Sequence, residues 1–171
     1  FMVAPQWQEL LERAAADPAT AGWLAPYYLG VLYLHQGQRA AAQAAWETAQ
    51  QRQPTAWSGR GLAFLAWQQG DFGRARAGYQ AACQLRPADV ALAIETCRFL
   101  LAGGEEAACL ALIAGLPEPL RQVGRLRFLE AQAALRAGDF ERVERFFTDP
   151  LEMPDLREGE DALTDLWFDY Q

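Results

Sequence analysis

A repeat of 33 residues is the feature of this sequence that most limits how the chain can fold. Residues 28–54 and residues 61–87 align with each other without a gap. Landmark pairs keep one spacing throughout: Gly37 and Gly70, Ala42 and Ala75, Trp46 and Tyr79, Ala49 and Ala82, Pro54 and Pro87. Such a repeat is typical of proteins built from stacked copies of one small unit, because a single unit cannot bury its apolar face alone.

The landmarks predict the same unit in both copies: a helix, a tight turn, a second helix and a stop. The glycine is expected to end the first helix, because glycine adopts the left-handed backbone conformation at the least cost. The first alanine is expected where two helices approach closely. The aromatic residue four positions later is expected to fill the space between helices. The proline follows the second helix and forbids its continuation.

The composition also favours helices. The chain has 33 alanines among 171 residues but only two isoleucines, whereas strand-rich proteins are enriched in Val, Ile and Thr. There are 15 arginines and neither lysine nor asparagine. The sequence therefore predicts an all-α fold.

The spacing resembles that of the tetratricopeptide repeat family. The first copy carries the family's landmarks at Leu29, Gly30, Tyr33, Gly37, Ala42, Trp46, Ala49 and Pro54. The second copy keeps Leu62, Ala63, Gly70, Ala75, Tyr79, Ala82 and Pro87, with Ala66 where a bulky aromatic residue is usual. The resemblance implies a right-handed α-solenoid of antiparallel helix pairs, with about three to four repeats and a C-terminal helix.

The register divides the chain into a repeat array over residues 1–150 and a tail over residues 151–171. Within the array it predicts a half repeat at 5–18, full repeats at 20–54 and 56–87, and looser repeats at 88–117 and 120–150. A half repeat at the start suggests a piece of a longer solenoid. Apolar residues at that end would need a cover, either the rest of a parent protein or a neighbouring copy: Trp7, Leu10 and Leu11.

The C-terminal end of the chain carries the net charge. From Asp149 onward there are eight acidic residues and one arginine, so residues 1–148 are formally neutral and the charge of −7 belongs to residues 149–171. Residues 162–170 have helical apolar spacing. Two roles stay open: a helix that caps the last repeat, or a segment that docks on another surface through Leu163, Leu166, Trp167 and Phe168.

The tail sequence is also similar to the closing segments of large bacterial proteins that join a domain of unknown function to tetratricopeptide repeats. The similarity lies in residues 156–160 and 163–168. It implies that the chain is the C-terminal part of a larger protein.

In the tetratricopeptide repeat family, the first helix of each repeat lines a groove that binds ligands. The register carries this role to Leu24, Tyr27, Val31, Leu34 and His35 in the first repeat, and to Trp57, Arg60, Phe64, Trp67 and Gln68 in the second. It adds Ala93 and Cys97 in the third repeat, and Arg125, Phe128, Gln132 and Arg136 in the fourth. Aromatic anchors beside arginine favour binding hot spots. The alternative is that these aromatic residues are buried against neighbouring helices.

Other classes of site are not expected. A pI near 4.7 argues against nucleic acid, and no apolar run is long enough to predict a membrane span. Three scattered cysteines predict neither a zinc site nor a disulfide framework, so we expect no metal, no cofactor and a reducing, cytoplasmic location. His35 and Ser58 lack an acidic partner in any catalytic pattern, so we expect no enzyme activity.

The sequence thus predicts a non-enzymatic module that binds a peptide or a neighbouring domain in an aromatic and arginine-bearing groove. It lacks the lysine and asparagine residues with which some family members clamp the acidic C-termini of chaperones. Two alternatives stay open. One is an accessory C-terminal domain of a larger bacterial enzyme that acts on carbohydrate. The other is a structural unit that self-associates through its N-terminal end or its tail.

Overall fold

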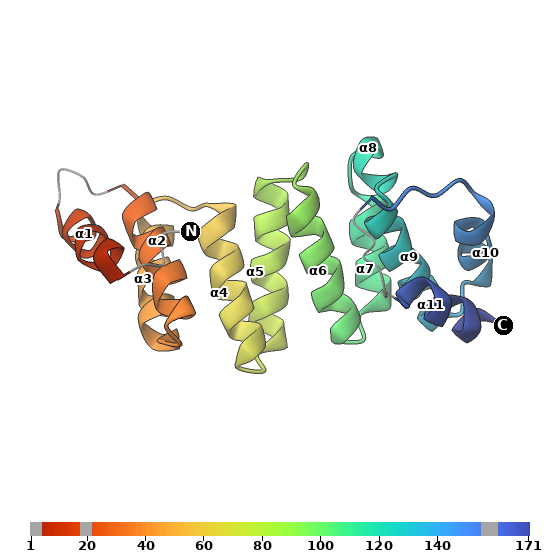
Figure 1. Ribbon diagram of the computed structural model, residues 1–171, viewed down its shortest axis with the longest axis horizontal. Helices are drawn as coiled ribbons and strands as arrows, with labels where there is room; N and C mark the ends of the chain where they lie inside the picture. The colour runs from red at the N-terminus through yellow and green to blue at the C-terminus, as the bar shows by residue number, and fades with distance from the viewer. Residues whose placement is uncertain (1–4, 18–21, 155–160) are drawn as a thin grey trace. The chain divides into compact units, whose positions relative to one another are not determined.

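The computed structural model describes residues 5–17, 22–154 and 161–171, and all secondary structure in these ranges is helical (Figure 1). The chain divides into two compact units, Phe1–Arg86 and Pro87–Gln171. The division falls between the second and third predicted repeats. Positions 18, 20 and 21 of the predicted repeats, and positions 156–160 of the tail resemblance, lie outside the described residues.

The first unit contains two helical hairpins preceded by a single helix. Its helices are α1 (Pro5–Ala16), α2 (Leu24–His35), α3 (Arg39–Arg52), α4 (Ala56–Gln68) and α5 (Phe72–Leu85). Helix α2 pairs with α3 and α4 pairs with α5, while α1 packs on α2 and α3 packs on α4. The two hairpins occupy the segments in which the sequence predicts the two full repeats.

The turn inside each hairpin depends on glycine. Gly37 and Gly70 have φ angles of 77° and 80°, which L side chains rarely adopt. The next residue then closes the helix end, since the Gln38 amide donates to the Tyr33 carbonyl at 2.8 Å and the Asp71 amide donates to the Ala66 carbonyl at 2.9 Å. The predicted role of these glycines is confirmed.

Trp46 of α3 fills the space between the first helices of the two hairpins. Its indole lies on Gly30 of α2 and on Gly61 of α4, where an added Cβ would collide with the ring. Its Nε1 donates a hydrogen bond to the Tyr27 carbonyl at 3.1 Å. Trp46 is buried, as is Ala42 one turn earlier. The predicted packing role of this aromatic residue is confirmed, and the structure adds that two glycines make it possible.

The start of α4 accounts for the single serine. Thr55 caps this helix, because its Oγ1 accepts a hydrogen bond from the Ser58 amide at 3.3 Å. The buried Ser58 hydroxyl contacts Thr55 Oγ1 at 2.8 Å and donates to Gln50 Oε1. Ser58 therefore joins α3 to α4 and is enclosed by structural partners.

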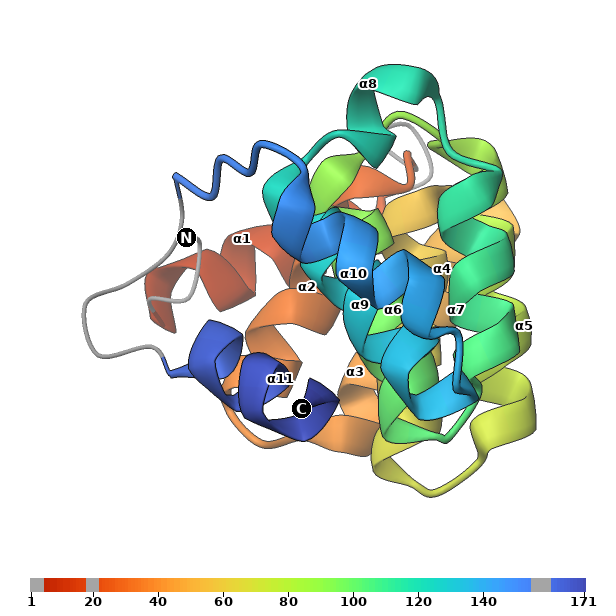
Figure 2. The ribbon, with the colours of Figure 1, turned by 90° about the vertical axis from the view of Figure 1, so that its right-hand side faces the viewer.

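The second unit is less regular. Its helices are α6 (Val90–Ala102), α7 (Glu106–Ala114), α8 (Glu118–Arg121), α9 (Gly124–Ala137), α10 (Phe140–Thr148) and α11 (Ala162–Tyr170). Helix α6 packs on α7 and α9, and α9 also packs on α7, α10 and α11 (Figure 2). The sequence pattern did not predict α8, which has only four residues and carries Pro119 in its first turn.

The tail helix α11 packs within its own unit. Leu166 is 4% exposed and lies in a cluster with Phe128 of α9 and Phe146 of α10. The ring of Trp167 meets that of Phe147 edge to face, with centroids 4.9 Å apart. Capping is therefore the role that the structure gives to Leu166. Docking elsewhere is left to the outer side of α11, where Trp167 is 43% and Phe168 71% exposed.

Candidate protein-interaction surfaces

The first candidate surface is formed by α2 and α4 of the first unit. Tyr27 on α2 is half-buried, and burial raises the pKa of its hydroxyl, while the positive charge of Arg60 on α4 opposes that rise. Helices α2 and α4 pack on each other, and the Trp46 indole lies against Gly30 and Gly61. The structure thus places on neighbouring helices a tyrosine and an arginine that lie 33 residues apart in sequence and that the register predicts for the groove.

Two aromatic side chains lie beside Tyr27. The ring centroid of Tyr27 lies 5.8 Å from that of Trp23 and 5.2 Å from that of Tyr28. Trp57 lies at the start of α4, three residues before Arg60, and the Arg86 guanidinium stacks over its ring at 5.2 Å. Trp57 therefore has a partner within the unit, in the arrangement of a cation–π pair.

The other predicted residues of α2 and α4 divide by exposure. Val31, Leu34, Phe64 and Trp67 are half-buried, whereas His35, Arg60 and Gln68 are exposed. Val31 and Leu34 pack with one side against the cluster around Trp46. A half-buried side chain is fixed by its neighbours and still offers a face to a ligand. Leu24, at the start of α2, is 52% exposed.

In the second unit the structure places several predicted groove residues in the interior. Arg125 and Phe128 of α9 are buried, and so are Ala93 and Cys97 of α6. Phe128 is covered because α11 and α10 pack over it. The register alone could not show this, because the covering helix belongs to the tail and not to a repeat.

Gln132 and Arg136 remain at the surface and line a second, small cavity. This cavity, of about 390 Å³, lies between α6 and α9, and Arg98 and Leu101 line its other side. The Arg136 Nη1 donates to the Leu101 carbonyl at 2.9 Å. Two arginines and an amide therefore face the same space.

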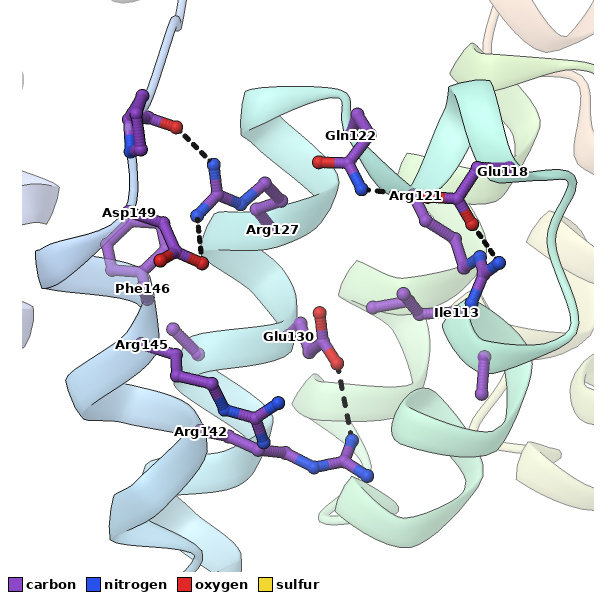
Figure 3. Close-up of a pocket in the computed structure, with 13 residues that line it drawn as sticks. Ile113, Glu118, Arg121, Gln122, Arg127, Glu130, Arg142, Arg145, Phe146 and Asp149 are labelled. Atoms are coloured by element: carbon purple, nitrogen blue, oxygen red, sulfur yellow. Dashed lines mark hydrogen bonds and ion pairs between the residues drawn. The ribbon is translucent and has the colours of Figure 1, made fainter.

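A larger cavity of about 650 Å³ lies among α7, α8, α9 and α10 (Figure 3). Its charged lining residues are Glu118, Arg121, Arg127, Glu130, Arg142, Arg145 and Asp149. Sequence reasoning did not find it, because its shape depends on the short α7 and on α8. The only sequence signal is the density of arginine between positions 121 and 145.

The cysteines form no site in the part of the chain that the structure describes. Cys83, Cys97 and Cys109 are buried free thiols, and a hydrogen bond with the Cys97 thiol lowers the pKa of Cys109. The described residues contain no cluster of three or more His, Cys, Asp or Glu side chains that could hold a metal ion. None of the described helices is long and apolar enough to cross a membrane.

Comparison of the structure with solved structures identifies the class of fold. The chain is similar to a tetratricopeptide repeat protein from Parabacteroides merdae, with a TM-score of 0.71 and 18% sequence identity. The match covers 95% of this chain and 65% of that protein's chain, so this chain spans about two thirds of that protein's length. The sequence matches no protein-family model and no curated protein.

The predicted all-α fold of the tetratricopeptide repeat type is thereby confirmed.

Proposed function

We propose that the chain is a protein-interaction module that binds a peptide segment of a partner on the surface of α2 and α4. The observation that carries the proposal is the packing of α2 on α4, which sets the half-buried aromatic side chains and the exposed Arg60 on neighbouring helices; the aromatic residues are Tyr27, Phe64 and Trp67. Tyrosine, tryptophan and arginine contribute most of the energy in many protein interfaces. A surface of this kind suits a segment with apolar side chains and an acidic group.

The rigid support beneath the surface favours this role. Trp46 packs against both helices through Gly30 and Gly61 and donates a hydrogen bond to the Tyr27 carbonyl at 3.1 Å. The backbone that carries Tyr27 is therefore fixed before a ligand arrives. A pre-formed site loses less conformational entropy on binding than a site that has to order itself.

The test begins with a random-peptide display selection against the full chain. Selected peptides are synthesised, and their affinities are measured by isothermal titration calorimetry. We expect Arg60→Gln and Trp67→Leu each to weaken binding by about tenfold, as loss of a hot-spot contact does. The matched controls are Arg39→Gln and Trp7→Leu, which change the same residue types on α3 and α1 and should leave affinity within about twofold. Equal binding to all four variants, or no enriched peptide, contradicts the proposal.

A second candidate is self-association, favoured by exposed apolar side chains near each end of the chain. Trp7 and Leu10 on α1 are 38% and 54% exposed, and Phe168 on α11 is more exposed still. Exposed apolar residues of this size often belong to interfaces. Light scattering over a concentration series tests it: the mass should rise with concentration and fall back in Leu10→Ser. A monomer at every concentration excludes it.

A further inference from the structure

The cavity among α7, α8, α9 and α10 exists because the second unit has shortened helices. Helices α7 and α10 have nine residues each, whereas the corresponding second helices α3 and α5 have 14. After Ala114 the chain turns away into α8, so the space that a longer α7 would fill stays open. Its volume, about 650 Å³, lies within the range of ligand-binding pockets.

The walls of the cavity carry fixed arginine side chains. Arg142 contacts Glu130 Oε1 through Nη1 at 3.2 Å and Asp139 Oδ2 through Nε at 2.9 Å. Arg127 lies 3.7 Å from Asp149 and also donates to the Pro150 carbonyl. These contacts hold both guanidinium groups in place and leave further N–H donors on each, since a guanidinium has five.

One arginine of the cavity, Arg145, forms no ion pair with a carboxylate of the described residues. The lining contains four arginines and three carboxylates, and Arg121 is paired with Glu118. Arg145 donates only a long hydrogen bond of 3.5 Å to the Glu141 carbonyl of its own helix. Among the described residues it has no carboxylate partner. Figure 3 shows Arg142 and Arg145 extending from α10 in the same direction, toward Glu130 of α9.

Apolar side chains lie beside the arginines. The exposed Ala114 and Pro150 line the cavity, together with the buried Ile113, Ala131 and Phe146. The cavity therefore offers the exposed Arg145 guanidinium beside exposed apolar groups. An anion alone would use only half of this surface, whereas a peptide with an acidic side chain beside an aromatic one would use both.

We infer that this cavity is a second binding site, independent of the α2 and α4 surface, for a peptide segment that carries an oxyanion next to an apolar side chain. Arg145 supplies the charge that the oxyanion neutralises, and Arg142 donates from the adjacent position. The exposed Ala114 and Pro150 contact the apolar side chain. Guanidinium binds carboxylate and phosphate oxygens alike, so the recognised group is either a carboxylate or a phosphate.

The test uses three end-blocked fluorescent peptides that differ in one residue after a phenylalanine: glutamate, phosphoserine or glutamine. Fluorescence anisotropy with the full chain measures their affinities at 50 mM and 300 mM NaCl. We expect dissociation constants below about 1 mM for glutamate or phosphoserine at low salt, with weaker binding at high salt and for glutamine. Whichever acidic peptide binds more tightly identifies the oxyanion.

The variants locate the site. Arg145→Gln should weaken the acidic peptide by about tenfold, as expected for loss of a charge-assisted hydrogen bond. Arg39→Gln removes the same charge from exposed α3 and should change the affinity by less than about twofold. Because Arg145 is exposed, circular dichroism should show unchanged thermal unfolding.

Three results overturn the inference: equal affinity for the glutamine peptide, unchanged affinity in Arg145→Gln, or no binding below about 1 mM. If the peptide instead loses affinity in Arg60→Gln while Arg145→Gln binds normally, it occupies the α2 and α4 surface. That outcome rejects the second site and leaves the proposed function intact.

Discussion

The contact between Trp46 and Gly61 predicts that Gly61→Ala destabilises the first unit. In Gly61→Ala, the new Cβ would lie 2.6 Å from Trp46 Cδ2. Carbon atoms in contact are normally about 3.5–4.0 Å apart, so the ring or the helix has to move by about 1 Å. The ring cannot retreat freely, because Gly30 lies against it too and its Nε1 donates to the Tyr27 carbonyl.

The magnitude follows from two opposing effects. Replacing glycine by alanine inside a helix stabilises it by about 0.5–1 kcal/mol. Overpacking a filled interior costs about 1–3 kcal/mol, and disturbing the Trp46 hydrogen bond costs about 1 kcal/mol more. We therefore expect Gly61→Ala to lower the free energy of unfolding by about 1–3 kcal/mol.

Gly59 of the same helix is a matched control. The nearest atom to a Cβ there is Gln50 Nε2 at 3.9 Å, an ordinary contact. Gly59→Ala should therefore stabilise the unit by about 0.5–1 kcal/mol. Urea unfolding followed by tryptophan fluorescence measures both variants, since five of the six tryptophans lie in the first unit. If Gly61→Ala shifts the midpoint upward, as Gly59→Ala does, the close packing of Trp46 is refuted.

Three further predictions concern other contacts. Leu166→Ala should lower the free energy of unfolding by about 2–3 kcal/mol and expose α11 to proteolysis, whereas Phe168→Ala should change it by no more than about 0.5 kcal/mol. Equal protease sensitivity of the two variants would contradict the capping role of α11. Ser58→Ala should lower the free energy of unfolding in urea by about 1–2 kcal/mol, because the buried hydrogen bond to Gln50 is lost; an unchanged free energy of unfolding would contradict the structural role of Ser58. Burial raises the pKa of Tyr27, so the stabilising contribution of its neutral hydroxyl is complete below pH ~10 and is lost as the pH rises through the folded-state pKa. Tyr27→Phe, which has no such group, should lose less stability than the wild type between pH 7 and 11 in urea unfolding. An equal loss in both proteins would contradict the raised pKa.

The repeat explains why the first unit could be predicted in detail. Gly37 with positive φ and Trp46 between helices each have one physical role, and the structure gives them that role, while Ala42 is fully buried beside Trp46. Their spacing fixed the helix pairs because each landmark constrains backbone or volume and not merely hydrophobicity. The roles of Gly30 and Gly61 against the indole required the three-dimensional contact.

The second unit shows where the sequence pattern stopped being informative. Phe128 carries the right register for a groove, yet α11 covers it, because a tail helix is outside the repeat period. The cavity beside Arg145 depends on where α7 ends and on the turn into α8. Neither property follows from periodicity, so the candidate site in this unit came from the structure alone.

The most direct test of the central claim is the affinity of one display-selected peptide for the wild type, Trp67→Leu, Arg60→Gln and the control Trp7→Leu. The α2 and α4 surface predicts that the first two variants lose about tenfold in affinity while the control binds within about twofold of the wild type. Equal affinities in all four proteins would show that the peptide binds elsewhere and would contradict the proposed function.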